Sequence, residues 1–432
     1  MMSKKSIGGL CGLLAPHALF LLLLLLCEPI SVLGQAPTWS LEACIQYAWN
    51  NNPEIQLQKI ELQQTRLQHR ERLAAFTPSI IASGNQPIQT KSSIQAAAHW
   101  ELRAELTLFQ GGSRINRLRS SREALLAEKH ETECLREDLR LEITRQYLDV
   151  LLAIELSQLA EESKKTLLTQ QVHTRNLVEA GSLPYASLLE LEAQVAQEIY
   201  QATEAANQCR EALLTLRQSL NLPSHIPLYP DTTLLTMPVP LPITLCADTL
   251  FSQTQDYPTL QAAHHRMEQT RWEWLSTQGL IFPNISLVAY YQPNYPQPFS
   301  FGLQLQWPLW HQGNTVRSIK RSELEYQRSQ LQLLQTQQAH YKNLQLLIHE
   351  ATCAYQQYLA ACHHFQAQEN SFKQVVQKFN LGLIDGNDYA RAHQQRINAR
   401  SEMLQSHFSY YFQCKILDYY QESTSTGASL SF

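Results

Sequence analysis

The chain has 432 residues, 44% hydrophobic and 17% charged, and its formal net charge at pH 7 is −4. This length is enough for two or three ordinary domains. Lysine and arginine form no dense run anywhere in the sequence. Nucleic-acid binding depends on concentrated positive charge, so it is the first class of function that the sequence excludes.

Residues 1–36 have the pattern of a secretory signal peptide: a basic start, an apolar run over 18–26, and small residues up to a cleavage position near Ala36. Cys27 raises lipidation as an alternative, but Leu26 is larger than the residue that a lipobox places before its cysteine. The later apolar runs are shorter than a bilayer requires. We therefore expect an exported chain that enters a membrane core, if it does so, as β-structure.

The chain has nine cysteines, two of them before residue 36, and none of them follows a CxxC spacing. Most lie in helical patterns, where a cysteine behaves as a small buried apolar residue. The sequence favours unpaired thiols, with some disulfides in an exported chain as the alternative.

Residues 37–221 form the first predicted structural unit. Its first helix begins with Ser40 as the N-cap and is expected to break near residue 50, before Pro53. The helix that follows the strands is free of proline and glycine and would be about 100 Å long. The remaining elements of the unit are strands near 79–87 and 99–109 and helices over 113–180 and 185–220.

Residues 222–246 are rich in proline and are predicted to be a linker, placed in an equatorial region of the molecule. A second unit over 247–421 repeats the plan of the first, and a polar tail follows over 422–432. The expected elements of the second unit are strands near 285–291 and 299–309 and helices over 314–381 and 387–420.

The two units are related by a sequence repeat. Pro53 and Pro258 lie 205 residues apart, and Gly181 and Gly382 lie 201 residues apart. Internal repetition of this kind decides the fold class. We predict a mainly α protein with a small β part, built from a duplicated unit of helix, β-hairpin, long helix, turn and helix.

The second strand of each hairpin alternates strictly between apolar and polar residues. In the first unit Glu101, Arg103 and Glu105 lie between apolar residues, and in the second unit glutamines do. Such a period of two predicts strands with one apolar face. The residues expected to face lipid are Trp100, Leu102, Leu106 and Leu108 in the first strand, and Phe299, Phe301, Leu303, Leu305 and Trp307 in the second.

Four such strands cannot close a barrel alone, and a membrane tolerates no open sheet edge. If these strands meet lipid, several chains must combine them around an aqueous lumen. The predicted architecture is then a short β-barrel continued by a cylinder of long helices. The alternative for each hairpin is a soluble β-hairpin packed on a helix.

The order, spacing and duplication of these elements resemble the TolC-like outer-membrane efflux protein family over residues 40–420. The matching stretches are Ser40-Leu41-Glu42, Asn52-Pro53-Glu54, Thr77-Pro78-Ser79-Ile80, Leu106 to Gly112, Ala180 to Leu183 and Leu381 to Ile384.

The resemblance implies a homotrimer located in the outer membrane and periplasm, with a 12-stranded β-barrel in the membrane and a 12-helix α-barrel tunnel in the periplasm. Such a channel passively conducts substrates outward in an efflux or type I secretion system, without catalytic chemistry and without a cofactor or metal. Its partners are further copies of itself, outer-membrane lipid, a periplasmic adaptor (membrane fusion) protein and an inner-membrane pump. The sequence does not indicate the cargo.

The resemblance also suggests where the periplasmic end would close. Family members carry aspartates just after the turn of the second unit, and Asp388 matches one of these positions. A second acidic position of the family is Arg391 here, so the two residues are expected to form an i,i+3 pair. Asp385 lies within the turn, where an aspartate also serves as a turn and N-cap residue.

The two turns resemble the points at which family adaptors dock. The candidate docking residues are Gly181, Ser182, Leu183, Gly382, Leu383 and Ile384. A glycine at such a position is also what ends a helix in the left-handed conformation.

Enzyme motifs are absent from the sequence: there is no GxSxG, HExxH, P-loop or GxGxxG. His264-His265 and His363-His364 are adjacent pairs, which point about 100° apart on a helix and do not form a ligand face. The alternative to a channel is an exported helical-bundle or coiled-coil surface protein without a pore.

Overall fold

The structure is a computed structural model that describes residues 38–85, 99–232, 247–254, 256–293, 296–310, 312–381 and 383–427. The predicted signal peptide, Cys27 and most of the predicted linker lie outside the described residues. The chain divides into two compact units, Met1–Thr38 and Trp39–Phe432. Apart from Thr38, everything that follows concerns the second unit.

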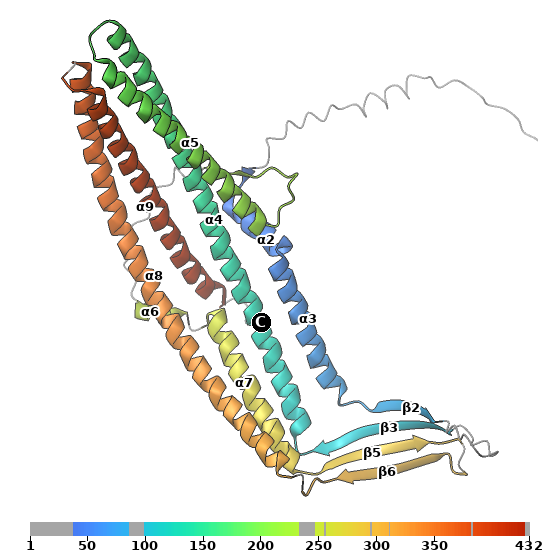
Figure 1. Ribbon diagram of the computed structural model, residues 1–432. Helices are drawn as coiled ribbons and strands as arrows, with labels where there is room; N and C mark the ends of the chain where they lie inside the picture. The colour runs from blue at the N-terminus through green and yellow to red at the C-terminus, as the bar shows by residue number, and fades with distance from the viewer. Residues whose placement is uncertain are drawn as a thin grey trace, which may run out of the picture. The chain divides into compact units, whose positions relative to one another are not determined.

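Helices dominate the second unit, as predicted (Figure 1). They are α2 (Leu41–Asn51), α3 (Pro53–Ala74), α4 (Ser113–Glu179), α5 (Tyr185–Ser219), α6 (Ala247–Gln253), α7 (Pro258–Gln278), α8 (Asn314–Asn380) and α9 (Gly386–Gly427), with a short 3₁₀ turn η2 (Gly279–Ile281). No helix in these ranges is long and apolar enough to cross a membrane.

Local capping explains where the first helices begin and end. The Ser40 hydroxyl accepts a hydrogen bond from the backbone N–H of Ala43 at 3.2 Å. The side chain of Asn52 accepts one from the N–H of Glu54 at 2.8 Å, and Pro53 occupies the first position of α3. The break predicted near residue 50 is confirmed at Asn52.

The two long helices, α4 and α8, have 67 residues each and are therefore about 100 Å long. Helix α9 runs to Gly427, beyond the end expected near residue 420 and into the stretch expected to be a polar tail. No proline or glycine precedes Gly427 there, so nothing in the sequence stops the helix earlier.

Helix α4 is the central element of the bundle (Figure 1). It packs beside α3 and α7 near the strands, and beside α5 and α9 near the helical turns. The largest buried cluster lies where α2, α4 and α5 meet and includes Ile143, Tyr147, Leu151 and Leu216. The Tyr147 hydroxyl lies 2.9 Å from the backbone oxygens of Trp39 and Asp231, which ties the start of the unit to the described part of the predicted linker.

Four of the strands form an antiparallel sheet in the order β2-β3-β5-β6. Their bounds are β2 (Ser79–Asn85), β3 (His99–Gln110), β5 (Asn284–Tyr291) and β6 (Phe299–Gln306); a separate two-stranded sheet pairs β1 (Thr38–Trp39) with β4 (Tyr229–Pro230). The pairing of β3 with β5 joins the hairpins of the two repeats.

Strand β6 ends at Gln306, earlier than the expected range over 299–309. Pro308 follows two residues later and has no N–H for a ladder bond. Trp307 therefore lies just outside the strand, and its indole N–H donates to the backbone oxygen of Ile281 at 3.1 Å.

Glycine is required where β3 passes into α4. Gly111 has φ +56°, and a Cβ at this position would lie 2.3 Å from the backbone oxygen of Gly279. This close approach brings the start of α4 next to the end of α7. It therefore fixes the position of the sheet relative to the helices of both repeats.

Candidate functional site

Strand pairing sorts the residues of the four-stranded sheet onto two faces, because partners in an antiparallel pair share a face. One face is apolar on all four strands. Its residues are Ile80, Ala82 and Gly84 on β2; Trp100, Leu102, Ala104, Leu106 and Phe109 on β3; Ile285, Leu287, Ala289 and Tyr291 on β5; and Phe299, Phe301, Leu303 and Leu305 on β6.

The apolar face is open to its surroundings. Phe301 is 79% exposed, Leu303 72% and Ile80 72%. Soluble monomers rarely expose a continuous apolar surface of this kind, so the face indicates contact with lipid or with another chain.

The opposite face is mainly polar. The Arg103 guanidinium donates to a Glu105 carboxylate oxygen at 2.8 Å and lies 5.7 Å from the centre of the Tyr290 ring. The Gln292 amide donates to Glu101 at 2.8 Å. The charges of β3 are thus held in place by neighbouring side chains on the face that is turned away from the apolar one.

The sheet departs from simple alternation in one place. The pairing of β3 with β5 shifts register between Thr107 and Phe109, so that Phe109, and not Leu108, pairs with Ile285. Leu108 occupies the irregular position and is 54% exposed. A bulge inserts one residue and reverses the alternation beyond it, which the period of two in the sequence does not reveal.

The turn between α4 and α5 closes with a left-handed glycine. Gly181 has φ +74°, its N–H donates to Val178, and the N–H of Ser182 donates to Leu177 at 2.8 Å. These bonds form a Schellman motif, which satisfies the last carbonyls of the helix. Gly181 and Ser182 are exposed, whereas Leu183 is half-buried.

The turn between α8 and α9 contains the corresponding bond: the N–H of Leu383 donates to Lys378 at 2.9 Å. Leu383 is 69% exposed, and Ile384 packs against a buried cluster between the helices. Gly382 lies outside the described residues.

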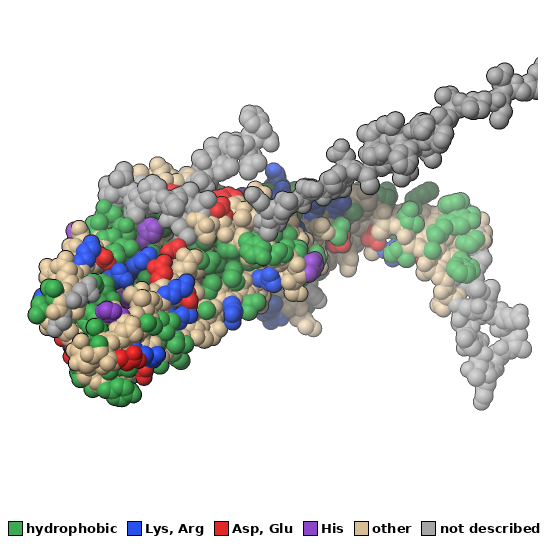
Figure 2. Space-filling model, turned by 90° about the horizontal axis from the view of Figure 1, so that it is seen from above, with side chains coloured by type: hydrophobic (Ala, Val, Ile, Leu, Met, Phe, Trp, Pro, Cys, Tyr) green, Lys and Arg blue, Asp and Glu red, His purple; other side chains and the backbone are tan. Residues whose placement is uncertain are grey.

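Asp385 and Asp388 lie at the start of α9 and differ in role. The Asp385 carboxylate accepts the backbone N–H of Asp388 at 2.8 Å, which is N-cap chemistry. Asp388 and Arg391 form an ion pair at 3.8 Å, with both side chains more than half exposed. The i,i+3 pair predicted from the sequence is confirmed. Seen from above, basic and acidic side chains are interspersed over the helical part of the molecule (Figure 2).

A buried cluster joins the two helical hairpins, α4–α5 and α8–α9, near their turns. It consists of Leu167, Leu191, Val195, Phe372, Phe379 and Tyr389. No motif in the sequence indicates a polar group beside it. Ser163 lies 2.6 Å from a Glu198 carboxylate oxygen and 2.9 Å from Nε2 of His393. The carboxylate contacts the hydroxyl and not the imidazole, so the three residues lack the order of a catalytic triad.

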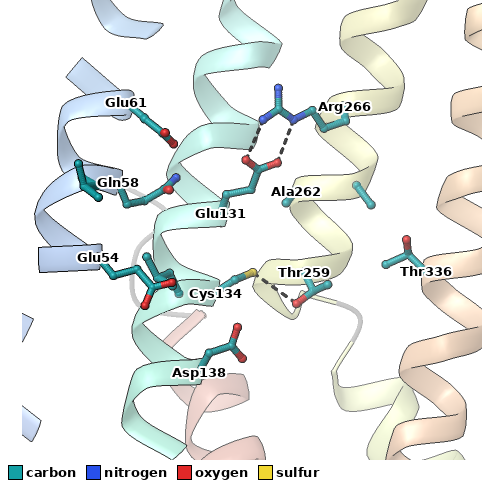
Figure 3. A pocket seen from close by; sticks show the side chains of 13 residues that line it. Glu54, Gln58, Glu61, Glu131, Cys134, Asp138, Thr259, Ala262, Arg266 and Thr336 are labelled. Atoms are coloured by element: carbon teal, nitrogen blue, oxygen red, sulfur yellow. Dashed lines mark hydrogen bonds and ion pairs between the residues drawn. The ribbon is translucent and has the colours of Figure 1, made fainter. Parts of the chain in front are cut away.

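A pocket of about 660 Å³ lies between α3, α4, α7 and α8 (Figure 3). Arg266 binds Glu131 through two hydrogen bonds, at 2.9 and 2.7 Å. Burial, followed by the nearby Glu54, raises the pKa of Asp138. Burial raises the pKa of Cys134 to about 11, so this residue is a thiol and not a thiolate nucleophile at neutral pH.

One histidine of each adjacent pair contacts a carboxylate. His265 contacts Glu123 at 2.8 Å, and His364 contacts Glu402 at 3.3 Å. Within the described parts of the chain, no group of three or more His, Cys, Asp or Glu residues is arranged to hold a metal ion. The cysteines in these parts are free thiols, and Cys246 lies outside them.

Several solved structures of membrane channels share the fold of this chain. The CusC structure is 17% identical, with 86% of this chain and 90% of that one covered and a TM-score of 0.75. The CmeC outer membrane channel of Campylobacter jejuni is 15% identical, with 87% and 84% covered and a TM-score of 0.74. The MtrE outer membrane channel of Neisseria gonorrhoeae is 16% identical, with 86% of each chain covered and a TM-score of 0.72. At these identities the likeness establishes the fold.

No curated protein matches the sequence significantly. The family model described as "Outer membrane efflux protein" matches residues 44–222 and 253–411, which is most of the chain and includes both repeats. The resemblance inferred from the sequence is thereby confirmed, and the chain belongs to the outer membrane efflux protein family.

Proposed function

We propose that three copies of this chain form the outer-membrane exit duct of a tripartite efflux or type I secretion system, through which substrates pass passively to the exterior. The observation that carries the proposal is the four-stranded sheet with one wholly apolar and exposed face. Exposing this face to water costs a large free energy, and placing it in the hydrocarbon core of a membrane avoids that cost.

The sheet edges support assembly from several copies. Strands β2 and β6 lie at the two ends of the order β2-β3-β5-β6, so each has one partner within the sheet. In lipid every backbone N–H and C=O needs a partner, and only a closed sheet supplies one. If β6 of one copy pairs with β2 of the next, three copies give twelve strands, and the face that carries Glu101 and Arg103 lines an aqueous lumen.

The helices support the same assembly. Near the sheet they are packed in the order α3, α4, α7, α8, so that α3 and α8 are the outer members of the layer (Figure 1). Leu57 on α3 is 62% exposed and Leu331 on α8 is 63% exposed. Contact between α3 of one copy and α8 of the next would bury such leucines and continue the lumen as a tunnel of helices.

The turns and the start of α9 form the periplasmic end in this proposal. A periplasmic adaptor would dock on the turn residues, and an inner-membrane pump would supply the energy, because the duct itself is not an enzyme. Asp388, with Asp385 and Arg391 beside it, would lie at the constriction. The docking residues are Gly181, Ser182, Leu183, Gly382, Leu383 and Ile384.

Single-channel recording of the purified protein in planar bilayers tests the duct, together with the mass of the detergent-solubilised particle. We expect a trimer and stable openings of uniform conductance. A folded monomer that never inserts would overturn the proposal and favour a helical surface protein without a pore.

A further inference from the structure

A polar cluster lies in the contact between the two helical hairpins. Ser163 on α4 is 1% exposed, Glu198 on α5 is 1% exposed and His393 on α9 is fully buried. Because α4 and α5 belong to the first repeat and α9 to the second, this cluster is part of the joint that holds the repeats together near their turns.

Proton counting fixes the direction of the hydrogen bonds. The Ser163 hydroxyl has one proton and donates it to Glu198. Its second contact, to Nε2 of His393, therefore requires that Nε2–H donates to the hydroxyl oxygen. The other ring nitrogen, Nδ1, then carries the lone pair of a neutral imidazole.

Two polar atoms of the cluster lack a partner. Nδ1 of His393 and Oε1 of Glu198 are buried without a hydrogen bond. A proton added to Nδ1 would therefore find no acceptor. The ring is also surrounded by aromatic side chains, with the Phe372 ring centre at 5.6 Å and the Tyr389 ring centre at 6.4 Å.

Each helix around this site carries a charged group in its vicinity. Glu198 approaches from α5, across the Ser163 hydroxyl of α4. On α9 itself, Arg396 lies nearby and pairs with Glu369 of α8 at 3.3 Å. One turn further, Arg400 of α9 lies 3.6 Å from the exposed Glu162 of α4. Of these groups, Arg396 disfavours a proton on His393.

We propose that Ser163, Glu198 and His393 form a proton-sensitive joint between the two hairpins, in which protonation of His393 in mild acid weakens the contact of α9 with α4 and α5. While the helices are packed, the added proton of the imidazolium has no acceptor. Once the helices separate, water can accept it. The inference concerns one chain and holds whether or not the assembled protein conducts.

The direction of the effect follows from the pKa. Burial, with a smaller contribution from Arg396, lowers the pKa of His393 to about 4. In the separated hairpins the imidazole would regain its ordinary value of about 6.5. The packed state is therefore favoured above pH 6.5, and this preference is lost as the pH falls from about 6.5 towards 4. At pH 5 the equilibrium shifts towards separation by roughly 30-fold.

Hydrogen exchange of the purified protein in detergent, corrected for the intrinsic effect of pH, measures this shift. We expect the protection factors of residues 191–202 on α5 and 389–400 on α9 to fall by up to roughly 30-fold between pH 7.5 and pH 5. In His393→Gln, whose side-chain amide can still donate to Ser163 but does not titrate, the same segments should keep their protection.

His340 provides the matched control. It is also buried, contacts the Thr254 hydroxyl at 3.0 Å and has a pKa lowered by burial, but it lies on α8 away from the joint. His340→Gln should leave the response of α5 and α9 unchanged. Glu198→Gln should retain the response, because His393 is still present to titrate.

Several results would overturn the proposal. One is wild-type protection that does not change between pH 7.5 and pH 5; another is a response that persists in His393→Gln or disappears in Glu198→Gln. If His393→Gln fails to fold, exchange of the imidazole C2 hydrogen in the wild-type protein gives the pKa of His393 directly. A value at or above 6.5 would also contradict the joint.

Discussion

The sheet and the hairpin joint present opposite arrangements of polar and apolar residues. In the sheet, apolar side chains such as Phe301 face outward and charged ones such as Arg103 lie on the other face. In the helical hairpins, apolar side chains such as Leu191 are buried in the joint, and Asp388 and Arg391 near the turns are exposed. The proposed function accounts for this difference, because it places the sheet in hydrocarbon and the hairpins in water.

The largest effect is expected when a residue on the apolar face of β6 is replaced by aspartate. If the apolar face meets lipid, Phe301→Asp would place a carboxylate in the hydrocarbon in every copy, at a cost of about 2 kcal/mol each. We expect no trimer in the membrane fraction. Gln304→Asp, on the opposite face of the same strand, should assemble normally. Equal behaviour of the two variants in membrane fractionation would contradict the assignment of the faces.

Substitutions at the junction between the sheet and the helices should have the next largest effect. In Gly111→Ala the new Cβ would lie 2.3 Å from the Gly279 oxygen at φ +56°, so we expect a loss of at least about 2 kcal/mol. Gly112→Ala is the control: φ is +76°, but no atom lies within 4 Å of the new Cβ, and the cost should be about 1 kcal/mol.

Thermal unfolding followed by circular dichroism ranks these two variants. The midpoint of Gly111→Ala should lie clearly below that of Gly112→Ala. The reverse order would mean that the approach of Gly111 to Gly279 does not hold the sheet against the helices.

The smallest effect on stability is expected at the exposed start of α9. Asp388→Ala removes one partner of an exposed ion pair and should change the free energy of unfolding by less than about 0.5 kcal/mol. If Asp388 lies at a constriction, the same variant should lower the cation preference of the channel, measured as reversal potential in a salt gradient.

Asp418→Ala is the matched control for Asp388→Ala, because Asp418 also forms an exposed i,i+3 pair on α9, with Lys415 at 3.6 Å, far from the turn. It should leave the reversal potential unchanged. Identical reversal potentials in wild type and Asp388→Ala would remove Asp388 from the constriction.

The spacing of apolar residues and the positions of proline and glycine predicted most of the fold. The alternation around Phe301 and the proline- and glycine-free stretch of α4 are local signals, and helices and strands follow such signals directly. The Asp388–Arg391 pair was also predictable, since its spacing along one helix brings the two side chains together.

What the sequence did not reveal depends on contacts between distant segments. The bulge at Leu108 is defined only by the pairing of β3 with β5, and the anchoring of Trp307 depends on Ile281. The Ser163–Glu198–His393 cluster joins three helices, and each of its residues alone looks like an ordinary polar residue of a helix. Such features require the register of one element against another, which a single sequence does not contain.

The central claim is that three copies join their sheets edge to edge, β6 of one copy against β2 of the next. Disulfide crosslinking tests it most directly. In a cysteine-free background, Ser83→Cys on β2 would be combined in turn with cysteine at Ser300, Gln304 and Gln306 on β6, all on the polar face. For at least one pair, we expect oxidation in membranes to give covalent dimers and trimers and nothing larger. Crosslinks within single chains only, or an open-ended ladder of oligomers, would contradict the closed trimer.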